Sequence, residues 1–117
     1  MIEPQITYRG MEHSPAMDER IRELTNKLEQ FHPKITQVHV VVDEQDRHKR
    51  NGNLFNVRID VHVPGHEIVA TKQEHEDPYV AVGDAFDVLT RQLEENIRKV
   101  RGEVKRHRAE RGDNAAP

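Results

Sequence analysis

Basic side chains recur at helical spacing near the C-terminal end of the chain, where they could bind phosphates. Arg91, Arg98, Arg101, Lys105 and Arg108 follow one another at intervals of three, four or seven residues. At about 100° per residue these intervals keep the side chains in one row along a helix. Such a row can contact successive phosphates of a nucleic-acid backbone, and each Arg can engage two phosphate oxygens at once. The spacing is therefore compatible with nucleic-acid binding, but the row alone does not establish such a site.

An ordinary solvated helix face is the alternative explanation of this row. Glu94, Glu95 and Glu103 interrupt the positive charge, and Glu94 stands four residues before Arg98, the stabilising order for an ion pair. The charge distribution favours binding. Residues 91–111 contain eight Lys/Arg and four Asp/Glu, whereas the whole chain has 18 and 21 and a net charge of −3. A positive segment on an acidic body is an asymmetry typical of polyanion binding.

Residues that could support catalysis are few. The one serine, Ser14, is better explained as a helix cap, and without cysteine there is neither a thiol nucleophile nor a thiolate metal site. No glycine-rich phosphate-binding loop is present. Among eight histidines, His62 and His66 have ligand-like spacing, but Pro64-Gly65 turns the chain between them and no third ligand is implied. We therefore expect no enzyme, metal site, cofactor or small-molecule substrate.

Base stacking is not expected to contribute to binding. Proteins that stack unpaired bases present exposed aromatic rings. This chain has three Phe and two Tyr, and all five fall at apolar-face positions of the predicted elements. Recognition through phosphates and shape, as for folded RNA, is the mode that remains.

The basic row belongs to a long helix predicted over residues 77–108. Asp77 suits the N-cap, and Pro78 suits the first helical position. Apolar residues then recur every three or four positions, at Tyr79, Val82, Phe86, Leu89, Leu93, Ile97, Val100 and Val104. The basic row should lie a quarter to a third of a turn from this seam. Because the helix would be about 46 Å long, it should leave the globular body near Gly102.

The preceding chain predicts four strands and a shorter helix. A strand over residues 2–9 ends at Gly10, and a helix begins at Ser14-Pro15 and ends before Pro33. Alternating apolar residues predict strands over 38–43, 55–63 and 67–72, with a polar loop over 44–53 and a type II turn at Pro64-Gly65. The β-α-β-β-β-α order predicts an α+β fold.

In this fold both helices cover one face of a four-stranded sheet, giving a two-layer sandwich like a double-stranded-RNA-binding domain with an open second face. One domain is expected over residues 1–108, with a disordered tail over 109–117. The N-terminal residues lack the pattern of a signal peptide, and no segment reaches the roughly 20 apolar residues of a membrane span. We therefore expect a cytoplasmic protein without a membrane partner.

Several short motifs, in the same order along the chain, resemble the bacterial ribosome hibernation-promoting factors and ribosome-associated translation inhibitors. The matching pieces are Ser14-Pro15-Ala16, Lys27-Leu28-Glu29-Gln30, residues 37–41, His75-Glu76-Asp77 with Tyr79 and Ala81, and Arg91-Gln92-Leu93. The resemblance is to the short form of the family, so no C-terminal dimerisation domain is expected.

The resemblance implies binding to 16S rRNA of the small ribosomal subunit, around the mRNA channel and the A- and P-site tRNA positions, under stress or in stationary phase. Basic residues of both helices would make the contacts. The expected rRNA-binding residues are Arg20, Arg22, Lys27, Arg91, Arg98, Lys99, Arg101 and Lys105. Leu24, Val88 and Glu95 stand where relatives often carry basic residues, so the exact footprint stays open.

Two other functions also stay open. The chain could bind a structured RNA outside the ribosome, or it could be a protein-interaction module that uses the open sheet face. The sequence also leaves open the oligomeric state, the inducing stress, and whether ribosome dimerisation is promoted or opposed.

Overall fold

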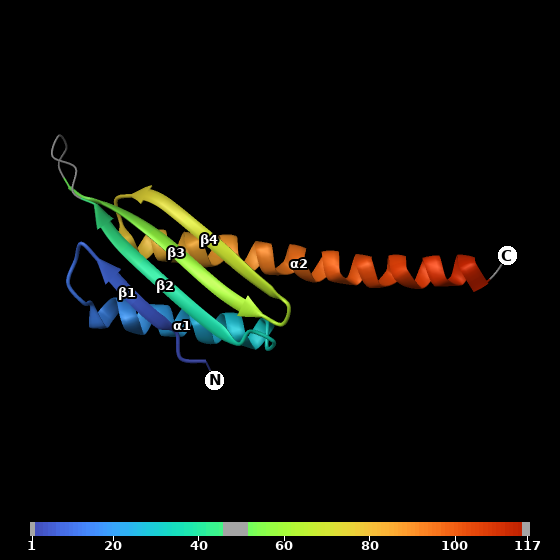
Figure 1. Ribbon diagram of the computed structural model, residues 1–117. Helices are drawn as coiled ribbons and strands as arrows, with labels where there is room; N and C mark the ends of the chain where they lie inside the picture. The colour runs from blue at the N-terminus through green and yellow to red at the C-terminus, as the bar shows by residue number, and fades with distance from the viewer. Residues whose placement is uncertain (1, 46–51, 116–117) are drawn as a thin grey trace.

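A computed structural model describes residues 2–45 and 52–115, with the side chains of the last helix described to Arg101, except that of Val100. It has the predicted β-α-β-β-β-α order and confirms the α+β fold (Figure 1). The elements are β1 (Gln5–Arg9), α1 (Pro15–Phe31), β2 (Gln37–Gln45), β3 (Leu54–Val63), β4 (His66–His75) and α2 (Pro78–Ala115).

The four strands form one sheet in the order β1-β2-β3-β4. β1 pairs in parallel with β2, which requires a crossover through α1, whereas β2, β3 and β4 form the predicted antiparallel meander. Both helices lie behind the same face of the sheet (Figure 1). The other face is open, so the sheet separates a helical surface from a strand surface.

Alternation along the strands directs one set of side chains toward the helices. Val38, Val40 and Val42 of β2 are buried, and so are four residues of β3, Phe55, Val57, Ile59 and Val61. The helices complete the core with Met17, Ile21 and Leu28 from α1 and Ala81, Val82, Ala85, Phe86, Leu89 and Leu93 from α2. This core confirms the inward faces that period-two and period-3.6 patterns predict.

The predicted helix caps are present. Ser14 Oγ accepts a hydrogen bond from Met17 N at 3.2 Å, and Asp77 Oδ1 accepts one from Tyr79 N at 2.9 Å. Pro64 and Gly65 join β3 to β4, and Gly65 has a φ of +81°, which the third residue of a type II turn requires.

β4 is longer than predicted and contains a bulge that the sequence does not announce. Phe55 pairs with His75 but Val57 pairs with Lys72, so β4 has one extra residue between these pairs. Glu74 takes up the irregularity with a φ of +55°, and its amide donates a 2.8 Å hydrogen bond to Asn56 Oδ1. β4 therefore reaches His75, two residues before the cap of α2 at Asp77.

α2 continues beyond the end predicted at residue 108. It passes through Gly102 and reaches Ala115, so residues 109–115 continue the helix where a disordered tail was predicted. A single interior glycine costs only about 1 kcal/mol, and residues 103–111 are mainly Glu, Lys, Arg and Ala, which favour helix. Residues 116–117 lie outside the described part. As predicted, the helix projects beyond the sheet, and the molecule is 69 Å along its longest axis (Figure 1).

Candidate nucleic-acid interface

Two of the expected contacts, Arg20 and Lys27, share one side of α1. They are seven residues apart, hence about 20° from the same line along the helix. Arg20 is partly neutralised by Glu23, at 3.2 Å, whereas the exposed Lys27 has no ion pair among the described residues. Phe31, one turn beyond Lys27, lies beside α2 residues in a shared groove. This side of α1 therefore faces α2.

Arg22 lies on the other flank of α1. Its Nε donates a 2.7 Å hydrogen bond to Glu3 Oε1, in the segment that precedes β1. The hydrogen bond and the charge of Glu3 raise the pKa of Arg22 above its usual range. On the same flank, the amide of Ile2 donates to Glu29 at 3.0 Å. Arg22 therefore forms an exposed ion pair within the protein and lies on a different flank of α1 from Arg20 and Lys27.

Arg91 and Arg98 form the corresponding row on α2. Both are exposed, seven residues apart, and without an ion pair among the described residues. Arg91 comes two residues after buried Leu89, about 200° around the helix. The two arginines therefore project away from the sheet, and these two members lie farther from the apolar seam than the average predicted for the whole row.

The remaining expected residues diverge around α2. Lys99 and Arg101 are both exposed but two residues apart, so they project about 200° apart, to opposite flanks. Arg101 lies on the flank that faces α1, where it lines the groove with Phe31. The side chain of Lys105 lies outside the described part. The structure thus brings Arg20, Lys27, Arg91, Arg98 and Arg101 to the helical surface and its groove, but not Arg22 or Lys99.

Acidic residues share the helical surface with these cations. Glu23 stands beside Arg20, and exposed Asp87 and Glu94 lie in the same region of α2 as Arg91 and Arg98. Their spacing of three or four residues places each acid next to an arginine along the helix. The surface can therefore offer separate cationic points to phosphates rather than a uniform positive field.

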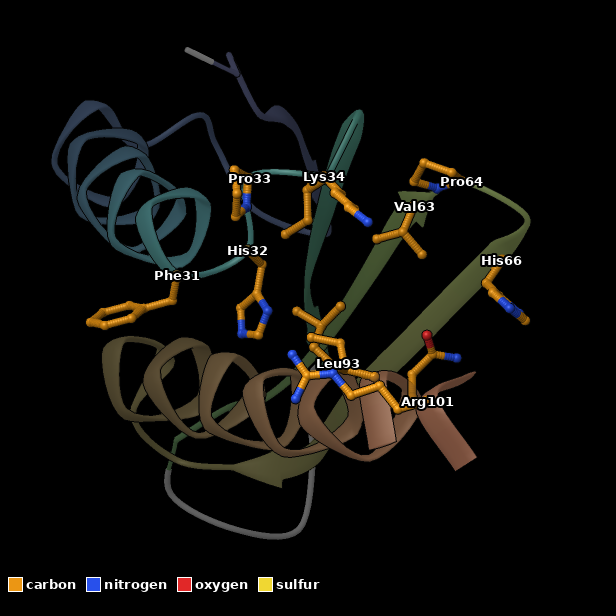
Figure 2. Close-up of a pocket in the computed structure, with 12 residues that line it drawn as sticks. Phe31, His32, Pro33, Lys34, Val63, Pro64, His66, Leu93 and Arg101 are labelled. Atoms are coloured by element: carbon orange, nitrogen blue, oxygen red, sulfur yellow. The ribbon is translucent and has the colours of Figure 1, made fainter. Parts of the chain in front are cut away.

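Two aromatic side chains are exposed, contrary to the expectation that all five are packed. The Phe31 side chain is at the last position of α1 and 76% exposed, and Tyr79, in the first turn of α2, is 46% exposed. Phe31 lies between the C-terminal end of α1 and α2 (Figure 2). The helical spacing between Leu28 and Phe31 predicts that Phe31 packs in the core. However, α1 ends at Phe31, so no further turn of the helix covers the ring. Pro33, two residues later, is the sequence feature that indicates this helix end.

Metal binding and membrane insertion find no support among the described residues. Among the residues whose side chains the structure describes, no group of three or more His, Asp and Glu is arranged to hold a metal ion. His62, one of the two histidines with ligand-like spacing, lies 3.7 Å from Glu67. None of the helices in this part of the chain is long and apolar enough to cross a membrane.

Comparison with known proteins places the chain among ribosome-related sequences. Residues 5–101 match the family described as Sigma 54 modulation protein / S30EA ribosomal protein. The chain belongs to this family. It is 35% identical over 97 residues to a ribosome hibernation promoting factor of Klebsiella oxytoca, a match that covers 82% of this chain and 94% of the relative. Membership also confirms that the protein is not an enzyme.

A second relative is a ribosome hibernation promotion factor of Deinococcus radiodurans, 32% identical over 89 residues. That match covers 76% of this chain but 46% of the relative, so the chain spans about half of the longer protein.

Two solved structures have the same fold. A ribosomal subunit interface protein from Coxiella burnetii matches with a TM-score of 0.66 and 24% identity, covering 79% of this chain and 93% of that one. The N-terminal domain of Thermus thermophilus Protein Y matches with a TM-score of 0.66 and 19% identity, covering 81% and 98%. At these identities the likeness concerns the fold alone.

The family match includes most of the candidate interface. Its limits, residues 5–101, contain every expected site residue except Lys105, and they contain the whole lining of the groove beside Phe31. The groove therefore belongs to the family domain and not to the projecting end of α2.

Proposed function

We propose that this protein is a ribosome hibernation factor that binds 16S rRNA of the small subunit, around the mRNA channel and the A- and P-site tRNA positions. Bound there, it would exclude mRNA and tRNA and so inhibit translation during stress or stationary phase. Membership in the S30EA family and similarity to two hibernation factors support a ribosomal partner.

The observation that carries the rRNA contact is the set of cations without ion pairs, among the described residues, on the helical surface. Lys27 extends from α1, and Arg91 and Arg98 extend from α2 on the side away from the sheet. Because no carboxylate among the described residues pairs with their charged groups, these side chains can replace the counterions of RNA phosphates. They extend from two helices that are fixed on one sheet, so they would contact phosphates at defined separations. Such an arrangement suits a folded RNA better than a flexible strand.

The roles of Arg22 and Lys99 differ in this proposal from those the sequence predicts. Arg22 lies on the other flank of α1, where it forms an exposed ion pair with Glu3. Lys99 projects to the opposite flank of α2 from Arg101, so it lies away from the groove that Arg101 lines. The proposed rRNA contacts are therefore Arg20, Lys27, Arg91, Arg98 and Arg101, with Lys105 as an extension along α2.

Sedimentation through sucrose gradients tests this function. Purified protein is mixed with isolated 30S subunits, 50S subunits or 70S ribosomes, and each fraction is assayed for the protein. We expect co-sedimentation with 30S and 70S particles but not with 50S subunits, together with inhibition of cell-free translation. Binding to deproteinised RNA but not to 30S subunits would instead indicate an RNA binder outside the ribosome. Binding to neither would indicate a protein-interaction module.

The salt dependence of the 30S complex tests the phosphate contacts. With about four contacts, the duplex rule predicts a loss of affinity on the order of a hundredfold between 50 and 200 mM monovalent salt. An affinity that hardly changed over this range would contradict a phosphate-based interface, even if co-sedimentation were observed.

A further inference from the structure

A groove opens between the C-terminal end of α1, the turn after β3, and the middle of α2 (Figure 2). Its volume is about 410 Å³, within the range of sites that hold small molecules or single nucleotides. The lining comes from three separate parts of the fold: residues 31–35 after and at the end of α1, the turn between β3 and β4, and the part of α2 from Leu93 to Arg101.

The floor of this groove is apolar and fixed. Ile35 and Leu93 are only 4% and 2% exposed, so their positions are set by the core. Phe31 is different, because its ring is 76% exposed at the edge of the groove. A large exposed aromatic ring beside a rigid apolar floor is a suitable surface for a flat apolar ligand with polar edges.

The rim of the groove is cationic. Lys34 and Arg101 line it, together with His32 and His66, and no lining residue is a carboxylate. Neither Lys34 nor Arg101 has an ion pair among the described residues. This is unusual in a chain with 21 acidic and 18 basic residues. An apolar peptide would gain nothing from these charges, whereas a nucleotide presents both a base that can stack on Phe31 beside the apolar floor and a phosphate for the rim.

We propose that this groove takes up one unpaired nucleotide of the bound RNA, with its base stacked on Phe31 and its phosphate held by Lys34 or Arg101. This inference rests on the proposed function, since it adds a base-stacking site to the phosphate contacts of the helical surface. It also differs from the prediction, made from the sequence, that base stacking does not contribute to binding. Arg101 belongs both to the groove and to the proposed phosphate contacts, because it projects from α2 toward α1 and lines the groove with Phe31.

A tryptophan in place of Phe31 provides a direct probe. The chain has no tryptophan, so Phe31→Trp introduces a single fluorophore while keeping an aromatic ring at the site. The variant is titrated with an oligo(A) dodecamer and, separately, with an abasic strand that has the same number of phosphates. Stacking predicts quenching of the tryptophan emission by oligo(A) and not by the abasic strand. Equal quenching by both strands, or quenching by neither, would overturn the stacking site.

Tyr79→Trp is the matched control. Tyr79 is also exposed and aromatic, but it lies in α2 14 residues before Leu93, about 21 Å along the helix axis. The fluorescence of this variant should not respond to oligo(A). Quenching to the same extent as in Phe31→Trp would mean that the strand contacts aromatic residues without selectivity for the groove, and would also overturn the proposal.

Affinity for 30S subunits separates this inference from the proposed function. Phe31→Ala should weaken 30S binding by roughly five- to 150-fold, the effect of losing one stacked base, whereas Tyr79→Ala should change it less than about twofold. If wild-type protein bound 30S subunits and Phe31→Ala bound equally well, the stacking site would be wrong and the ribosomal function would stand. If wild-type protein did not bind 30S subunits, the proposed function would fail, and the fluorescence titrations would still decide the stacking site.

Discussion

The hydroxyl of Tyr8 donates a 2.6 Å hydrogen bond to the carboxylate of Asp18, which joins β1 to the first turn of α1. The same hydroxyl lies 3.1 Å from the carbonyl oxygen of Ser14, and His13 also contacts the Asp18 carboxylate. Asp18 is only 8% exposed, so these partners replace the water it loses on folding. Burial alone would raise the pKa of Asp18, but hydrogen bonds from Tyr8 and His13 hold it below its usual value.

We predict that Asp18→Asn lowers the free energy of unfolding by about 2 kcal/mol at pH 7, the scale of a hydrogen bond to a charged group. Because the folded state depresses the pKa of Asp18, its contribution is fully present above the ordinary carboxyl pKa and is lost as the pH falls through the folded value. Urea unfolding from pH 7 to pH 3 should therefore show the two proteins converging in acid. A stability difference that stayed constant over this range would contradict the ionised role of Asp18.

Gly10 should not tolerate a side chain. It ends β1 with a φ of +69°, and a Cβ placed there would lie 2.3 Å from the carbonyl oxygen of Glu44. The neighbouring atom belongs to the backbone of β2, so it cannot rotate away. We expect Gly10→Ala to destabilise the protein by more than about 2 kcal/mol, because the left-handed conformation and the clash both oppose it.

Gly65→Ala provides the comparison for Gly10. Gly65 also has a positive φ, of +81°, but no atom lies within 4 Å of the position of its Cβ. Its substitution should therefore cost only the conformational part, about 1–2 kcal/mol. Thermal unfolding of both variants measures the difference, and a Gly10→Ala protein as stable as Gly65→Ala would refute the close approach of β1 and β2.

Truncation after Arg108 should leave the fold intact. Among the residues whose side chains the structure describes, Leu93 is the last of α2 in the core and Arg101 is the last that lines the groove. Truncation after Arg108 removes none of these core or groove residues and takes away only helical hydrogen bonds after that point. We expect a melting temperature within about 5 °C of the full chain, equivalent to roughly 1 kcal/mol. A larger drop in a calorimetric scan would mean that residues 109–117 pack against the domain.

The fold could be predicted from the sequence because each buried face has a regular period. Val38, Val40 and Val42 alternate with polar residues, and Leu89 and Leu93 continue a helical stripe, so the inward sides follow without knowledge of the neighbours. The bulge at Glu74 could not be predicted in this way. It depends on the pairing of β4 with Asn56 on another strand, and a single strand contains no signal of that register.

The candidate site was less predictable, because the charge or apolarity of a residue does not reveal which residues it will contact in the folded protein. Arg22 and Lys27 look alike in sequence, yet only the fold brings Glu3 to Arg22, from 19 residues away. Phe31 looks like a core residue, yet the end of α1 leaves its ring exposed. Both differences arise where a helix flank or end meets a distant segment, which local periodicity does not describe.

Reversal of the charges of the α2 row tests the central claim most directly. The double variant Arg91→Glu/Arg98→Glu should weaken binding to 30S subunits on the order of a hundredfold or more, since two charge-assisted contacts are replaced by repulsion. Both side chains are exposed and unpaired among the described residues, so the melting temperature should change little. The comparison variant is Arg9→Glu/Arg58→Glu, which makes the same change in net charge on the open face of the sheet. Because Arg58 also loses its 2.9 Å ion pair with Asp60, the melting temperature of this variant is measured alongside its affinity.

The decisive measurement is the dissociation constant of these two double variants and the wild type for 30S subunits at one salt concentration. The proposed interface predicts a large loss for Arg91→Glu/Arg98→Glu and an affinity within about threefold of wild type for Arg9→Glu/Arg58→Glu. Equal losses in the two variants would mean that net charge, and not the helical surface, governs binding. Wild-type affinity in Arg91→Glu/Arg98→Glu would contradict the assignment of the helical surface as the rRNA-binding site.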